Sequence, residues 1–184
     1  DMLYFEALKG NPDCGGIVSY NCLSGEPVLD ISQGRPMLMR LPNSKLTVAD
    51  FMRNELYSAF AALKNGNDIL LKKENVKLDK ISAHGGLYKT EGVGQKITAA
   101  ALNTKVTVMK TAGEGGPWGM AVLALYAISK SDESLENYLD NKIFASAESV
   151  SVDPDLRDVE GFDKYMERYN NAIAVERLAC EKLN

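Results

Sequence analysis

Two glycine-rich turns contain the residues of this sequence that are best placed to do chemistry. The first is Gly85-Gly86, and the second begins 28 positions later and contains Gly113, Gly115 and Gly116. Each turn follows a run of residues typical of a β-strand and precedes a run typical of a helix. Glycine lets the backbone approach a ligand closely and present its N–H groups, and a helix N-terminus favours negative charge. The pattern therefore predicts a phosphate-bearing ligand at one or both turns.

The residues beside the turns allow more than one interpretation. Neither turn matches the Walker phosphate loop or the dinucleotide fingerprint, and two glycines after a strand are often only a tight turn. His84 could touch a ligand or simply end its strand. Trp118 could stack on a purine or cover the edge of the sheet, and Lys89 could bind a phosphate or remain in solvent. The residues alone leave these alternatives open.

The elements that must position the turns alternate between strands and helices. Strands are expected over 17–20, 36–41, 80–83 and 105–109, and helices over 3–10, 47–73, 91–102, 117–130, 134–140 and 159–183. This order predicts an α/β layered domain whose later strands are parallel. Both turns then lie at the carboxyl ends of strands, where ligands bind in open α/β sheets.

Several details of these elements are expected from their apolar patterns. The helix over 117–130 is apolar on nearly all sides, which predicts that it is buried. In the long helix over 47–73, Asn65-Gly66-Asn67 could introduce a kink or a break, and the stripe that includes Val48, Leu56, Phe60 and Leu63 is interpreted as core. Apart from its short helix, the polar segment 131–157 is expected to be loop.

The last helix is expected to have one apolar and one solvated face. The residues expected to point inward recur at helical spacing and are Phe162, Tyr165, Met166, Tyr169, Ile173, Val175 and Leu178. The charged stretch 176–182 is expected to face solvent. A single domain is predicted over 1–184, with its C-terminal helix over 158–184.

Composition excludes several classes of protein. The chain has 184 residues, 45% of them hydrophobic and 25% charged, as in soluble globular domains. Its net charge of −4, with no dense basic run, argues against nucleic-acid or membrane partners. No apolar stretch reaches the roughly 18 residues of a membrane span. Three cysteines and one histidine show no metal-ligand spacing, and they predict reduced thiols in the cytoplasm.

Three stretches, in order, resemble the C-terminal half of the FGGY carbohydrate kinases. They are YNCLSGE (20–26), HGGLYKTEGVGQKITAAALNTKV (84–106) and GEGGPWGMAVLALY (113–126). The resemblance extends over about 15–130 and is closest to sequences of xylulose kinases. It implies an RNase H-like, actin-like fold of two lobes, with ATP and sugar in the cleft between them. This chain would be the C-terminal, nucleotide-binding lobe.

The resemblance also implies a site and a reaction. The ribose and α-phosphate of the nucleotide would lie near Gly85, Gly86, Leu87, Lys89 and Thr90. The adenine pocket would include Gly113, Glu114, Gly115 and Gly116. With Mg²⁺, the γ-phosphoryl group of ATP would pass to a hydroxyl of a ketose such as D-xylulose.

The chain departs from the family pattern in several ways. The family's catalytic aspartate stands in a GDN or GDQ setting and its phosphate hairpin resembles GTSG, and neither occurs in 1–184. His84 stands where many members have glycine, and Pro27 follows Glu26 where an arginine is usual. The chain is therefore expected to be an incomplete C-terminal lobe that is inactive by itself, in a protein roughly two to three times as long.

Other functions remain open alongside this one. The missing strands would leave a sheet edge that invites a partner, so that a homodimer is conceivable. The lobe could also be a non-catalytic, actin-like interaction or sensor module. A kinase of the same family could act on another polyol, such as a hexulose or glycerol.

Overall fold

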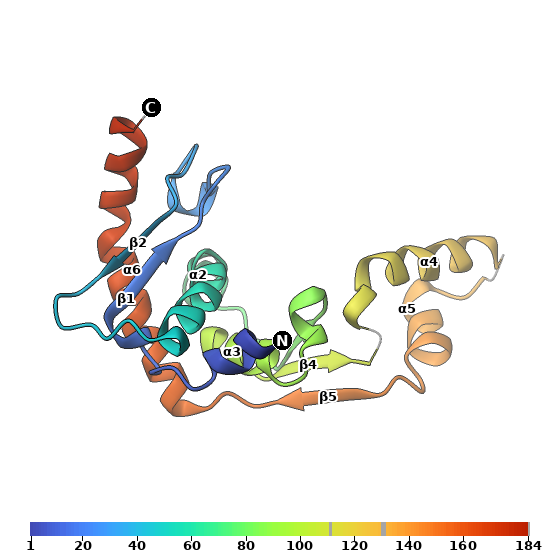
Figure 1. Cartoon of the computed structure of the whole chain (residues 1–184). Coiled ribbons are helices and arrows are strands. Elements are labelled where there is room, and N and C mark those ends of the chain that lie inside the picture. The colour runs from blue at the N-terminus through green and yellow to red at the C-terminus, as the bar shows by residue number, and fades with distance from the viewer. Residues whose placement is uncertain (111, 130–131, 184) are drawn as a thin grey trace.

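The structure, a computed structural model, describes residues 1–110, 112–129 and 132–183. The helices are α1 (Met2–Ala7), α2 (Val48–Asp68), α3 (Val93–Leu102), α4 (Gly115–Ile128), α5 (Leu135–Tyr138) and α6 (Leu156–Lys182). The strands are β1 (Ile17–Tyr20), β2 (Met37–Arg40), β3 (Ile81–Ala83), β4 (Val106–Met109) and β5 (Ser149–Val152). The α/β class is confirmed, and the strands are divided between a β1-β2 sheet and a β3-β4-β5 sheet (Figure 1).

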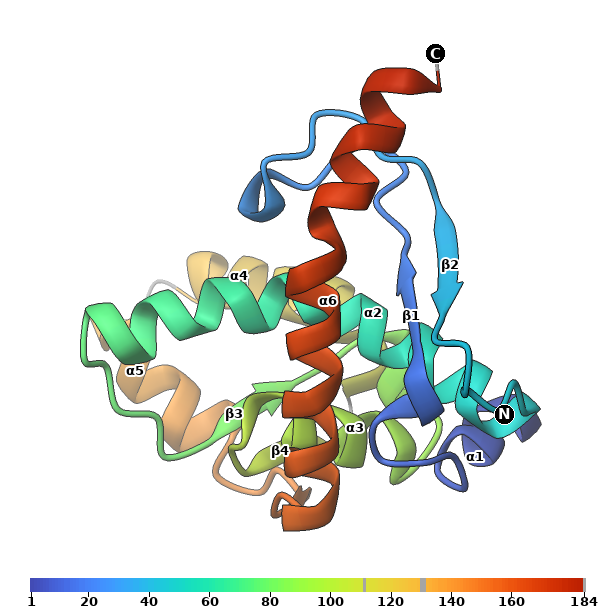
Figure 2. The same cartoon turned by 90° about the vertical axis from the view of Figure 1, so that its left-hand side faces the viewer.

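The hydrophobic core lies between β1 and the helices α2, α3 and α6. Its largest fully buried side chains are mostly aromatic and include Tyr20, Tyr57, Phe162, Tyr165 and Tyr169. The Tyr57 ring meets Phe162 and Tyr165 edge-on, at centroid distances of 4.7 and 5.4 Å. Each ring of this kind buries about 150–250 Å². Since α6 runs along β1 and also contacts α2 and α3, these elements form one packed base (Figure 2).

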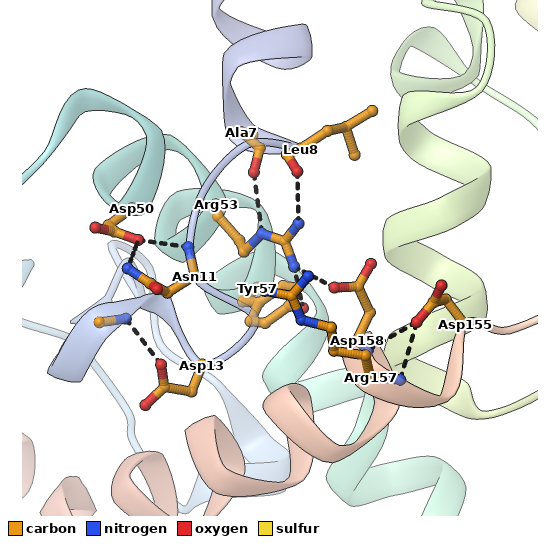
Figure 3. Close-up of polar contacts among 11 residues, drawn as sticks. Ala7, Leu8, Asn11, Asp13, Asp50, Arg53, Tyr57, Asp155, Arg157 and Asp158 are labelled. Atoms are coloured by element: carbon orange, nitrogen blue, oxygen red, sulfur yellow. Dashed lines mark hydrogen bonds and ion pairs between the residues drawn. The ribbon is translucent and has the colours of Figure 1, made fainter.

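A buried arginine joins three helices in this base (Figure 3). Arg53 on α2 is 2% exposed, and its guanidinium donates to the carbonyl oxygens of Ala7 and Leu8 at 3.0 Å each. It also donates to Asp158 Oδ1 on α6 at 2.7 Å. Carbonyls at the end of a helix have no partner within it, so Arg53 supplies the donors that the end of α1 needs. We call Arg53 with these three partners the Arg53 junction.

The apolar stripe predicted on α2 is only partly its core face. Leu56 and Phe60 are buried as expected, whereas Val48 and Leu63 are 60% and 51% exposed. Asn65-Gly66-Asn67 do not split the helix, since α2 runs through these residues and continues as a π-helical turn over Ile69–Lys73.

The second sheet carries the strands that precede the two glycine turns. β3 and β4 pair in parallel, as expected, with Ile81 opposite Val106. β5 pairs antiparallel with β4 and corrects the expectation of a loop there. Its Ser-Val-Ser-Val sequence alternates as a strand does, and this signal was missed within a mostly polar segment. α3 packs against this sheet, and Gln95 Nε2 donates to the Val150 carbonyl at 2.9 Å. The short helix α5 confirms the one expected over 134–140 and continues as a π-helical turn, Leu139–Ile143.

The expectation that the apolar helix over 117–130 is buried was wrong. In the corresponding α4, which the structure describes from Gly115 to Ile128, Val122 is the one buried residue, and Met120 and Ile128 are 69% and 72% exposed. Together with α5, α4 projects from the end of the β4-β5 ladder, away from α6 (Figure 1). The Trp118 and Phe144 rings pack together, but this contact covers only one side of the helix. An apolar sequence favours burial, but the described residues cover too little of α4 to bury it.

The last helix is confirmed, but the expected faces are wrong toward its C-terminal end. Val175 and Leu178, which were expected to point inward, are 46% and 53% exposed. α6 buries Phe162, Tyr165, Met166 and Tyr169 as predicted. Glu176, which was expected in solvent, is fully buried and accepts a hydrogen bond from the Arg35 backbone N–H at 2.7 Å. Residue 176 lies 14 positions, nearly four complete helical turns, after residue 162 and therefore on the same face. The position of Glu176 on the helix therefore outweighs its charge. The Arg35 backbone N–H offsets part of the free-energy cost of burying the carboxylate.

Candidate functional site

The first glycine turn follows β3 directly and has a conformation that requires glycine. Gly85 has φ 111° and ψ −179°, a region that is essentially restricted to glycine. A short 3₁₀ helix, η4 (Gly86–Lys89), follows it, and α3 begins at Val93. The turn thus redirects the chain sharply at the carboxyl end of β3.

The second turn follows β4 and lies in contact with the first. It consists of the 3₁₀ turn η5 (Ala112–Glu114) and the first residues of α4. A side chain on Gly115 would collide with the His84 ring at 2.7 Å, and one on Gly113 would come within 3.0 Å of the Lys89 side chain. Lys89 Nζ donates to Glu114 Oε1 at 2.5 Å. Because parallel neighbours end at the same edge of a sheet, the strands bring the two turns together.

These contacts separate the glycines of the two turns into two groups. Gly113 and Gly115 leave room for Lys89 and His84, so packing between the turns accounts for them. Gly86 and Gly116 are exposed, have no positive φ, and have no atom within 4 Å of the position that a side chain would take. Nothing in the described residues requires glycine at either place. A ligand that lies against the backbone would require it.

Two of the expected site residues point toward the protein interior. Leu87 packs against the hydrophobic core. Thr90 is 5% exposed, and its hydroxyl donates to Asp1 Oδ1 at 2.7 Å. These side chains support the first turn from beneath. Both are less exposed than Gly86 and Gly116.

The charged groups of the site are exposed. The side chains of Lys89 and Glu114 are 55% and 70% exposed. The hydrogen bond from Lys89, together with its positive charge, lowers the pKa of the Glu114 carboxyl. The Glu114 carboxyl is therefore ionised at neutral pH, and both side chains lie within reach of a ligand from solvent.

A hollow of about 410 Å³ adjoins both turns. It is lined by Tyr88, Lys89, Glu91, Gln95, Val108, Met109, Lys110, Gly113 and Val150. This volume lies within the range of small-molecule sites, and the mixture of apolar and polar side chains is typical of them. The sequence predicted only Lys89 and Gly113 of this lining. Val150 could not be anticipated without β5, whereas Val108 follows from the alternation along β4.

The described residues include no group of three or more histidine, cysteine, aspartate or glutamate side chains that could hold a metal ion. Mg²⁺ in phosphoryl-transfer sites is usually bound through substrate phosphates, waters and one or two carboxylates, so such a group is not required. Within the described part of the chain, no helix has the length and apolar character needed to cross a membrane. The three cysteines are free, as expected, and burial raises the pKa of the Cys14 thiol.

Comparison with protein families decides the relationship of this chain. The profile of the FGGY family of carbohydrate kinases, C-terminal domain, matches residues 1–128. The chain belongs to this FGGY family. A comparison with curated protein sequences finds no match.

Solved structures share the fold of the FGGY chain. A xylulose kinase from Rhodospirillum rubrum superposes with a TM-score of 0.71 at 17% identity, over 98% of this chain and 35% of its own. A gluconate kinase from Lactobacillus acidophilus gives 0.69 at 19%, over 95% and 35%. A glycerol kinase from Plasmodium falciparum, solved with ADP, gives 0.66 at 19%, over 95% and 33%. The chain thus has the fold of a FGGY C-terminal lobe and spans about a third of the length of these proteins.

Proposed function

We propose that this chain is the ATP-binding lobe of a carbohydrate kinase, which transfers the γ-phosphoryl group of ATP to a hydroxyl of its sugar in the full-length protein. One observation carries the proposal: the two glycine turns meet at one edge of the sheet, and Gly86 and Gly116 are exposed, with no atom within 4 Å of the position that a side chain would take. Residues 1–184 would form this single lobe, ending in its C-terminal helix.

The residues present fit an adenine nucleotide. The backbone around Gly86 and Gly116 can approach phosphates without hindrance, and the adjoining hollow has room for a base or ribose between Tyr88 and Val108. Lys89 offers a positive charge at the junction of the turns. Bound Mg²⁺ would neutralise charge that develops on the phosphates. This lobe would contribute binding and orientation, and the aspartate that accepts the hydroxyl proton is expected outside 1–184.

D-xylulose is the proposed sugar, on the strength of the motif resemblance. A second candidate is another polyol, since the xylulose, gluconate and glycerol kinases superpose on this chain about equally well. Backbone geometry therefore favours none of these substrates.

The remaining parts of the proposal concern location and partners. The net charge of −4 and the three free cysteines support a cytoplasmic protein that binds neither nucleic acid nor membranes. We also propose that the protein forms a homodimer, because β3 is an edge strand with one described partner, β4.

Calorimetric titration with ADP tests the nucleotide site. We expect Gly86→Val to weaken ADP binding by about ten-fold or more, since a branched side chain at this position fills the space the ligand needs. The thermal unfolding temperature should change little, because the new side chain meets no neighbouring atom.

Gly66→Val provides the matched control. Gly66 lies on α2, and the nearest atom to a side chain there is 4.0 Å away, on Val28. This variant should bind ADP with wild-type affinity. Equal ADP affinity in Gly86→Val and the wild type would contradict the proposed site.

A further inference from the structure

The two glycine turns are joined by an exposed ion pair. Lys89 belongs to the first turn and Glu114 to the second, and their charged atoms are 2.5 Å apart. The Lys89 stem lies across Gly113, within 3.0 to 3.6 Å of where a side chain would begin. Gly113 therefore leaves a channel along which Lys89 reaches Glu114. The pair closes the junction between the turns on the side where Lys89 and Gly113 line the hollow.

The two lysines that line the hollow are both paired with glutamates. Its lining contains two lysines, Lys89 and Lys110. Lys89 is paired with Glu114 and Lys110 with Glu148, and neither of these two glutamates belongs to the lining. Glu91 is the acidic residue in the lining itself. Lys89 and Lys110 thus line the hollow, while the carboxylates that pair with them belong to residues outside its lining.

We propose that the Lys89–Glu114 pair is a latch across the glycine turns, which a nucleoside diphosphate opens because Lys89 exchanges the Glu114 carboxylate for a ligand phosphate. The latch rests on the proposed nucleotide site and adds a property to it. It makes the site selective for phosphorylated nucleosides over the nucleoside alone, through a competition between two anions for one cation.

The exposure of the pair makes this exchange feasible. An exposed ion pair in water contributes little, because solvent and salt screen it. A diphosphate carries more negative charge than a carboxylate and offers more acceptor oxygens for the Lys89 ammonium. The flexible lysine stem lets Nζ move without any backbone change. The exchange therefore costs little free energy, and the new contact between Lys89 and the phosphate is stronger than the one between Lys89 and Glu114.

Calorimetric titration of the 184-residue chain with ADP and with adenosine tests the latch. In Glu114→Gln the competing anion is gone, so the ADP dissociation constant should fall by about two- to five-fold. In Lys89→Met the cation is lost and Glu114 is left unpaired beside the phosphates, so ADP should bind about ten-fold more weakly. Adenosine has no phosphate, and its affinity should stay within two-fold of wild type in both variants, roughly the size of an exposed-charge effect.

Asp153→Asn is the matched control for Glu114→Gln. Asp153 pairs with Lys105 at 3.3 Å and is 75% exposed, at the opposite end of β4 from the turns. It removes one negative charge, as Glu114→Gln does, and should leave ADP affinity unchanged.

The outcomes separate the latch from the site itself. Unchanged or weaker ADP binding in Glu114→Gln, or equal shifts for ADP and adenosine in either variant, would overturn the latch and leave the nucleotide site standing. A wild-type chain that binds neither compound would refute the nucleotide site, and the latch with it.

Discussion

Two regions of this lobe are held by ion pairs between distant segments, and they differ in nearly every other respect. In the Arg53 junction, the guanidinium is 2% exposed and donates to Asp158 and to two backbone carbonyls (Figure 3). At the glycine turns, Lys89 is 55% exposed and donates to Glu114. The first cation is held by several fixed partners, whereas the second remains accessible to a ligand.

The difference shows how to distinguish a cation that holds the fold together from a cation that is available to bind a ligand. Burial makes the loss of a partner expensive, so a buried cation with several acceptors fixes the elements that supply them. An exposed cation with one acceptor fixes little, and it can change partners at low cost. The glycines follow the same division, since a side chain on Gly161 of α6 would collide with Pro12 at 2.3 Å, whereas one on Gly86 would meet no atom within 4 Å.

Among effects of a single residue, the largest that tests this comparison is expected at Arg53. Arg53→Met should lower the free energy of unfolding by about 3 kcal/mol, because it leaves Asp158 and the end of α1 without their donor. Urea unfolding followed by circular dichroism measures this change. Lys89→Met is the matched control, and its urea midpoint should equal that of the wild type. A loss of similar size in Lys89→Met would remove the distinction between the two regions.

The effect expected from pH is smaller for each residue involved, and it should be confined to the packed base. Burial raises the pKa values of Tyr20, Tyr57, Tyr165 and Tyr169 above their usual value. Above pH ~10 the unfolded chain releases these protons while the folded chain keeps them, so stability falls as pH rises. Each tyrosine contributes a loss of up to about 1.4 kcal/mol per pH unit in this range.

Urea unfolding at pH 8, 10 and 11 measures the pH effect, and Tyr57→Phe supplies its control. Phenylalanine has no proton to release, so the variant should lose less stability than the wild type between pH 10 and 11. Identical pH profiles for the two proteins would contradict the assignment of this loss to buried tyrosines.

Much of the framework could be predicted from sequence, because apolar spacing reports burial along an element. The spacing of Phe162, Tyr165 and Tyr169 placed the core face of α6, and the strand–glycine–helix order placed both turns at strand ends. The burial of Glu176 was missed because its charge was given more weight than its position on the helix. The exposure of α4 was missed because composition reports what a helix prefers and not which neighbours it has.

The site was predictable as a location but not in its internal arrangement. Five glycines looked equivalent in the sequence, yet Gly113 and Gly115 accommodate neighbouring side chains whereas Gly86 and Gly116 do not. Such a distinction needs coordinates, since it depends on contacts between residues about 25 positions apart, such as Lys89 with Glu114. The hollow likewise depends on β5. This strand pairs with β4, although α4 and α5 separate the two strands in the sequence.

Amide hydrogen exchange with and without ADP is the most direct test of the central claim that both turns contact one nucleotide. The account predicts slower exchange in peptides covering 84–90 and 113–119 together when ADP is added, with no change around the Arg53 junction. Protection at neither turn, or a change at the Arg53 junction with none at the turns, would contradict it.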